Sequence, residues 1–163
     1  MIFPKYYIGP MSKNVVDCVI KHSQKYSIGL IPSRRQVDYC GGYVNKWDTK
    51  SFSNYLKKKK VLLCRDHGGP NQGLHLDDGV YSFLDDCDNL DLIHIDPFKD
   101  SESIYEAAEK TVSYIKMCSS RNQNIFYEVG TEEAIFKYEP EQLRWFLSCL
   151  KVFPTFFKPI LVA

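Results

Sequence analysis

The sequence predicts an α/β fold with about six βα units, arranged either as a (β/α) TIM-barrel, of which they would be six of the eight units, or as an open sheet. Two observations lead to this fold class: short apolar runs alternate with amphipathic stretches of helical length, and turn residues separate them along the chain. This alternation gives parallel strands with right-handed crossovers, and an open doubly wound sheet is the alternative architecture. Because a complete barrel needs about 200 residues or more, we expect residues 1–163 to form one domain, an incomplete barrel that cannot close by itself.

The first elements are two strands on either side of a helix. A weak strand is predicted at 5–9 and a second, apolar strand at 27–32. The helix at 12–26 lies between them, with Ser12 as its N-cap and a row of valine and isoleucine residues on one face. This βαβ order is the expected unit of a parallel sheet.

The centre of the chain continues the same order after a polar loop that contains glycine. A helix at 48–60 is capped by Asp48 or Thr49 and has an aromatic and leucine stripe to bury. The strand at 61–64 is apolar throughout, as strands covered on both faces are. A short helix is predicted at 77–87.

The last elements include the longest helix and a strand at the end of the sequence. They are a strand at 90–96, a helix at 101–120, a strand at 124–130, a helix at 139–153 with Pro140 in its first turn, and a strand at 158–163. In an unclosed sheet the last strand would present an apolar edge, which favours pairing with another chain.

Composition and charge narrow the possible partners. The chain is 44% hydrophobic and 25% charged, as in an ordinary globular domain, and its net charge of +1 provides no electrostatic attraction for nucleic acid or an anionic membrane. No run of about 18 apolar residues occurs. The six cysteines stand singly, which is typical of reduced thiols in the cytoplasm. We therefore expect a cytoplasmic protein with no nucleic-acid or membrane partner.

Polar residues gather in the segments that follow predicted strands. These segments are PSRRQVDYCGGY, RDHGGPNQ, HIDPFKD and EVGTEE. In parallel α/β folds ligands bind at the carboxyl ends of the strands, so these segments are where we look for a site. None contains a glycine-rich dinucleotide or phosphate-loop motif, which argues against a nucleotide-binding fold.

Asp66 and His67 form the sharpest candidate pair. In a functional interpretation His67 is a metal ligand or general base and Asp66 is a proton donor and acceptor. In the alternative interpretation the pair only begins a turn that the following glycines and proline shape. Adjacent residues point to opposite sides of a regular strand, so both can face one site only where the strand breaks into a loop.

Three further candidates lie in the next two strands. His94 and Asp96 are two residues apart and share a face of a regular strand, although a core histidine and a turn-forming aspartate are the alternatives. Glu128 is a carboxylate in an apolar strand and must be paired or neutralised if buried. A salt bridge to Arg65 or Arg35 is its alternative role.

Candidate substrate-binding residues come from several of these segments. Arg34, Arg35 and Gln36 directly follow the second strand and offer donors suited to a phosphate or carboxylate, with a solvated loop as the alternative. Asn71 and His94 complete the predicted substrate-binding set.

The same segments resemble a known family in order and spacing. QVDYCGGYVNKWDTKSFSNYL, RDHGGPNQ, LIHIDPFKD and YEVGTEE are similar to motifs of the class II tagatose-bisphosphate aldolase accessory-subunit family. The resemblance covers residues from about 30 to 133. It rests on several short motifs in one order.

The resemblance implies an aldolase-type TIM barrel and a role in the metabolism of galactitol, N-acetylgalactosamine or related sugars. Related class II aldolases use zinc to polarise the carbonyl of a ketose phosphate and stabilise an enediolate. Carried over by position, Asp66 would be the catalytic acid and His67 a ligand of Zn²⁺ or another divalent metal, with Glu128 and Asp96 as nearby catalytic carboxylates.

The resemblance leaves two roles open. If active, the chain would be a zinc-dependent aldolase or a sugar epimerase with a sugar-phosphate substrate. Members described as accessory subunits lack aldolase activity alone and support a catalytic partner. The chain would then be a non-enzymatic subunit that binds a catalytic aldolase subunit or self-associates.

Overall fold

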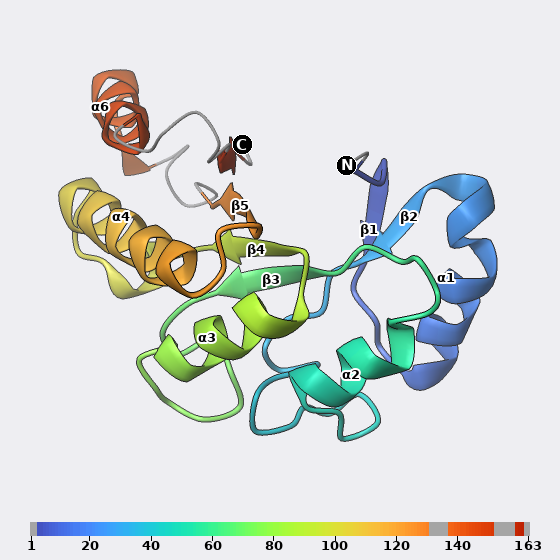
Figure 1. The fold of residues 1–163 in the computed structure, drawn as a ribbon. Coiled ribbons are helices and arrows are strands. Elements are labelled where there is room, and N and C mark those ends of the chain that lie inside the picture. Colours follow the sequence, from blue (N-terminus) through green and yellow to red (C-terminus); the bar gives the residue numbers. More distant parts are fainter. Residues whose placement is uncertain (1–2, 131–136, 152–158, 162–163) are drawn as a thin grey trace.

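The computed structural model describes residues 3–130, 137–151 and 159–161, in which short parallel strands alternate with helices (Figure 1). The strands are β1 (Tyr6–Ile8), β2 (Ile28–Leu30), β3 (Cys64–Gly68), β4 (Leu92–Ile95), β5 (Phe126–Val129) and β6 (Pro159–Leu161). The helices are α1 (Lys13–Tyr26), α2 (Thr49–Leu56), α3 (Val80–Asn89), the 3₁₀ helix η1 (Phe98–Asp100), α4 (Ile104–Arg121) and α6 (Pro140–Leu150).

The strands form two separate parallel sheets. One contains β1 and β2, and the other has the order β3-β4-β5-β6. Between the sheets, β2 and β3 meet at two isolated bridges, Leu30 to Leu63 and Ser33 to Asp66. Pro32 lies between these bridges and has no N–H to donate, so a regular ladder cannot run through this point.

The prediction of a barrel with six βα units is wrong. Barrel closure requires one continuous, staggered ladder of strands. Here the described strands are divided between a sheet of two and a sheet of four, and each strand is three to five residues long. The expected alternation and parallel pairing are present, and the result is a mixed α/β fold with two small sheets.

The helix starts follow the local sequence signals. The Ser12 side chain accepts a hydrogen bond from the Val15 amide, and Asp48 does the same for Ser51 at the start of α2. Pro140 occupies the first turn of α6, where no amide donor is needed. The end of the predicted helix 139–153 and the outer residues of the predicted strand 158–163 lie outside the described residues.

Two clusters of buried side chains form the core. Val16, Leu30 and Phe52 belong to the cluster around β2, α1 and α2, while Ile93 and Phe146 belong to the cluster around β4, α4 and α6. Helices that are neighbours in the chain also touch, since α2 packs on α3, α3 on α4, and α4 on α6 (Figure 1). No helix in the described ranges has the length and apolar character needed to cross a membrane.

The strands of the larger sheet send alternate residues to opposite faces. On β4, Ile93 and Ile95 enter the helix-covered core, and on β5 Tyr127 and Val129 do the same. His94, which lies between the two isoleucines, therefore points to the other face. This second face, opposite the helices, is where the candidate site lies.

Candidate functional site

A bulge in β3 brings Asp66 and His67 into the same site. Arg65 pairs with Ile93 and Gly68 with Ile95, so β3 uses one more residue than β4 over this stretch. The extra length is taken up at His67, whose φ of 45° lies in the left-handed region. The strand predicted at 61–64 is therefore displaced, and the two candidate residues lie within β3 instead of after it.

His67 is held by Asp96. Its Nδ1 lies 2.7 Å from Asp96 Oδ2, which leaves Nε2 on the side of Asp66, 3.6 Å from Asp66 Oδ1. Burial raises the pKa of Asp96, but the hydrogen bond and the electrostatic interaction with His67 outweigh this effect, so the pKa of Asp96 is lowered. Asp96 is thus a carboxylate that orients the His67 ring.

His94 is a buried imidazole that faces both His67 and Glu128. Its ring centroid lies 4.8 Å from that of His67, and its Nδ1 lies 3.9 Å from Glu128 Oε2. Burial, together with repulsion from His67, lowers the pKa of His94 to about 4. The ring is therefore neutral at pH 7. Its Nε2 is buried and has no hydrogen-bond partner among the described residues.

Glycine at 130 makes room for the His94 ring. A Cβ built on Gly130 would lie 2.5 Å from His94 Nε2 and 3.2 Å from Asp96 Cβ. The Gly130 amide donates to the Ile95 carbonyl, so its backbone is fixed beside β4. A larger residue there would displace the imidazole.

The side chains of Asp66, His67 and His94 can supply three metal ligands. One ligand atom from each lies within 4.8 Å of the other two. Two neutral imidazole nitrogens and a carboxylate oxygen are a ligand set that zinc accepts in catalytic sites, where a further position stays open. The unpartnered His94 nitrogen fits this role, because a buried ring nitrogen without a partner is otherwise costly.

The predicted catalytic carboxylates surround this cluster. Asp96 contacts His67, and Glu128 approaches both His94 and Cys64, whose Sγ lies 3.8 Å from Glu128 Oε2. The alternative interpretation was a salt bridge from Glu128 to Arg65 or Arg35, but Arg65 is bound to Asp86 and Arg35 lines a cavity beside His67. The structure therefore brings together Asp66, His67, His94, Asp96 and Glu128.

The predicted substrate-binding residues are divided. Arg35 lines a cavity of about 210 Å³ together with His67. Gln36 is instead buried in the turn after β2, where its Oε1 accepts a hydrogen bond from the Ser33 amide. Asn71 accepts a hydrogen bond from the Asp77 amide and so closes the loop after β3. These contacts give Gln36 and Asn71 local structural roles.

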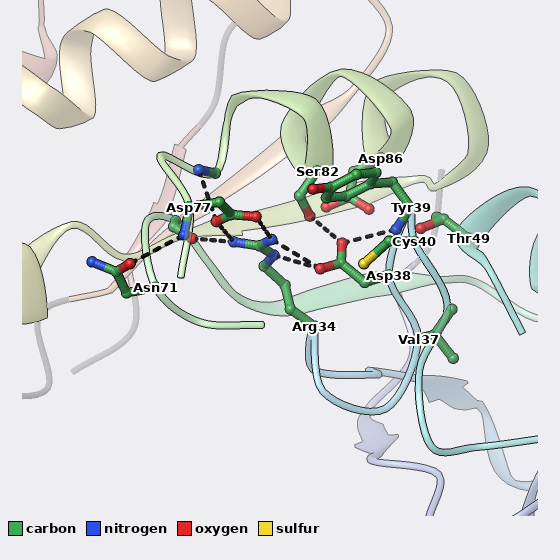
Figure 2. Close-up of polar contacts among 12 residues, drawn as sticks. Arg34, Val37, Asp38, Tyr39, Cys40, Thr49, Asn71, Asp77, Ser82 and Asp86 are labelled. Atoms are coloured by element: carbon green, nitrogen blue, oxygen red, sulfur yellow. Dashed lines mark hydrogen bonds and ion pairs between the residues drawn. The ribbon is translucent and has the colours of Figure 1, made fainter. Parts of the chain in front are cut away.

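The sequence analysis did not identify two buried arginine networks that support the site. Arg34 is bound by Asp38 and by both carboxylate oxygens of Asp77, and it donates to the Gly69 carbonyl (Figure 2). Ser82 on α3 donates to the same Asp38. This network ties the turn after β2 to the loop after β3, and the only sequence signal for it is the spacing of four between Arg34 and Asp38.

Arg65 is the centre of the second network. It forms two hydrogen bonds with Asp86 on α3, at 2.8 and 2.6 Å, and also donates to the carbonyls of Pro32 and Val37. Both side chains of the ion pair are fully buried. The pairing explains how a charged residue is accommodated in the middle of β3.

No protein-family model matches the sequence, and a search of curated proteins finds no match.

Proposed function

We propose that the chain is a divalent-metal-dependent protein of carbohydrate metabolism, with an aldolase or sugar-epimerase type of site for a phosphorylated sugar. The observation that carries this proposal is the cluster of Asp66, His67 and His94 on the sheet face opposite the helices. Zinc or another divalent ion would bind the two imidazoles, and it would supply Lewis acidity toward a substrate carbonyl. The family resemblance of the surrounding motifs supports the choice of substrate.

The residues around the metal ligands have defined roles in the proposed site. Asp96 holds His67 in the tautomer with the proton on Nδ1, so that Nε2 is available as a ligand. Burial raises the pKa of Asp66, which favours proton exchange with a substrate by this carboxylate. Substitution of Asp66 by Asn distinguishes a proton-transfer role, in which the metal stays bound, from a ligand role, in which metal affinity falls.

A non-enzymatic accessory subunit is the second candidate, and the exposure of β1 favours it. Tyr6 is 68% exposed and Ile8 is 37% exposed, on a strand that pairs with β2 on one side. Exposed apolar residues on such a strand can pair with a catalytic partner subunit or with a second copy of the chain.

A cytoplasmic location is part of the proposal. All six cysteines are free thiols, and three of them are buried. Free thiols at each cysteine position suit a reducing compartment.

Metal content tests the proposal directly. We expect about one zinc ion per chain after dialysis against a weak chelator, and loss of that ion in His94→Ala. His75→Ala is the matched control because His75 is exposed in the loop after β3 and belongs to no ligand cluster among the described residues. A folded wild-type protein without metal would reject the enzymatic proposal and favour the accessory subunit. Retro-aldol and epimerase assays on ketose phosphates then distinguish the two reactions.

A further inference from the structure

The cavity beside His67 is formed by the segments that follow three neighbouring strands. Its volume is about 210 Å³, and it is lined by Ser33, Arg35, His67, Gln72 and Lys99. Ser33 and Arg35 come from the turn after β2, Gln72 from the loop after β3, and Lys99 from η1 after β4. The cavity therefore opens at the carboxyl ends of the strands and shares His67 with the metal-ligand cluster.

The charge of this cavity is positive. Arg35 and Lys99 are both exposed, and neither forms an ion pair with any residue that the structure describes. The described residues that line the cavity include no aspartate or glutamate. Most other arginines in the described ranges are bound by a carboxylate, as Arg34, Arg65 and Arg121 are, so the unpaired Arg35 beside Lys99 stands out.

Gln72 adds an unsatisfied donor to the two cations. Its Oε1 accepts a hydrogen bond from Lys99 Nζ at 3.4 Å, which orients the amide. The Nε2 group of the same amide is buried and lacks a hydrogen-bond partner within the described part of the chain. A buried N–H without an acceptor destabilises the protein, so an acceptor supplied by a ligand would relieve that cost.

The loop that carries Gln72 is fixed by contacts outside the cavity. Arg34 Nη1 donates to the Gly69 carbonyl at 2.7 Å, and Arg34 also binds Asp77 at the far end of the loop. The Asn71 amide donates to the Asp77 carbonyl (Figure 2 shows Asn71 beside Asp77). The loop is therefore fixed by contacts that do not involve Arg35, Lys99 or the Gln72 side chain, which is the arrangement expected of a preorganised binding site.

We propose that Arg35, Lys99 and Gln72 form a subsite for a phosphate monoester, with the rest of the substrate extending past His67 toward the metal-ligand cluster. Guanidinium, ammonium and amide N–H groups together match the acceptor oxygens of a phosphate. The inference rests on the proposed function for the orientation of the substrate, but the subsite itself is formed without metal. It places the phosphate at the β2 and η1 side of the site and the reacting carbon beside His67.

The test is calorimetric titration of inorganic phosphate and of glycerol 3-phosphate into the full chain. The buffer contains a metal chelator, so that no metal is bound, and no other polyvalent anion. We expect saturable binding of both ligands, weakened at least about tenfold in Arg35→Gln and in Lys99→Gln, which is the loss expected for one charge-assisted hydrogen bond. Lys21→Gln and Arg144→Gln are the matched controls, since both residues are exposed and lie on α1 and α6.

Gln72→Leu separates binding from structure. Loss of the unpartnered amide should weaken phosphate binding about fivefold or more while the melting temperature stays equal or rises. Absence of saturable phosphate binding, or equal affinity in the wild type and in the cavity variants, would overturn the subsite. If inorganic phosphate bound and glycerol 3-phosphate did not, the assignment of the subsite to a phosphate monoester would be overturned.

The outcome is independent of the metal proposal. Phosphate titration in chelator reports only on the subsite, and zinc titration in phosphate-free buffer reports only on the ligand cluster. If phosphate binds and zinc does not, the subsite stands and the proposed metal site fails. The reverse result leaves the metal site and removes the subsite.

Discussion

In the proposed metal site, His67 and His94 are each placed beside a neighbouring carboxylate. His67 has a carboxylate of Asp96 on Nδ1, and His94 has Glu128 at 3.9 Å from Nδ1. In His67 this arrangement leaves Nε2 on the side of Asp66, at 3.6 Å from Asp66 Oδ1, and one ring nitrogen of His94 lies within 4.8 Å of the ligand atoms of both residues. Burial keeps His94 neutral well below pH 7, so its lone pair is available without prior deprotonation.

Gly130→Ala tests whether the placement of His94 depends on the lack of a side chain at 130. The new Cβ would overlap His94 Nε2 and displace the ring. We therefore expect zinc affinity to fall about tenfold or more, which is the usual effect of changing a residue that positions a metal ligand. Gly9→Ala is the control, because its Cβ would have neighbours at 3.6 Å, an ordinary contact distance. Zinc titration followed by competition with a chelator measures both variants. Equal affinities would show that His94 moves freely or is not a ligand.

At the residue scale, Asp66, His67 and His94 were singled out from the sequence, but only His67 was assigned as a metal ligand, with Asp66 as a catalytic acid and His94 as a substrate-binding residue. Charged and imidazole side chains within apolar strands, such as His94 and Glu128, are conspicuous, and strand periodicity places them on one face. Gln36 was assigned to substrate, but its amide is used by a local turn. Gln72 was not recognised, because only the loop fold shows that its donor is buried and unpartnered.

At the element scale, the helices were predicted well because their caps are local. Ser12, Asp48 and Pro140 act within one turn of the residues that they cap. The strand β3 was misplaced because its charged residues are stabilised by distant partners. Arg65 is buried against Asp86, 21 residues later in the chain, and no local pattern shows that pairing.

The loop between β3 and α3 has a pH-dependent support in Asp77. The hydrogen bond from Arg34 lowers the pKa of Asp77 in the folded protein. A lowered folded-state pKa contributes stability above the unfolded value of about 3.9, and this contribution is lost as the pH falls through the folded-state pKa. Asp77→Asn should therefore destabilise the protein by about 1–2 kcal/mol at pH 7, and by less below about pH 4.

Urea unfolding at pH 7 and at pH 3 measures this difference. Glu102→Gln is a suitable control because Glu102 is exposed and its side chain forms no ion pair in the described ranges, so its unfolding midpoint should stay close to the wild type. A destabilisation of Asp77→Asn that is equal at both pH values would contradict an ionic contribution. It would assign the effect to hydrogen bonding or packing alone.

At the scale of the whole molecule, the interruption between β2 and β3 determines the architecture. The periodicity of the sequence predicts alternating strands and helices but contains no information on whether neighbouring strands share a continuous ladder. Pro32 removes one donor at this position, and the two sheets meet there through isolated bridges. The barrel inferred from the motif resemblance and the βα count is therefore replaced by two sheets with two core clusters.

Arg65 joins these two halves. From β3 it donates to the carbonyls of Pro32 and Val37, which follow β2, while Asp86 holds it on the side of α3. A lysine has one charged centre and cannot satisfy the carboxylate and both carbonyls together. Arg65→Lys should therefore destabilise the protein by about 1–3 kcal/mol and loosen the junction more than either sheet.

Amide hydrogen exchange locates that effect. In Arg65→Lys, exchange should accelerate most at the Leu30 and Asp66 amides, which donate to Leu62 and Pro32 across the junction. The Gly130 amide, bonded to Ile95 within the larger sheet, should change little. Arg121→Met removes an exposed arginine paired with Asp88 and should leave all three amides close to the wild type. Uniform acceleration across both sheets would instead mean that the halves open as one unit, with Arg65 contributing to global stability and not to their junction.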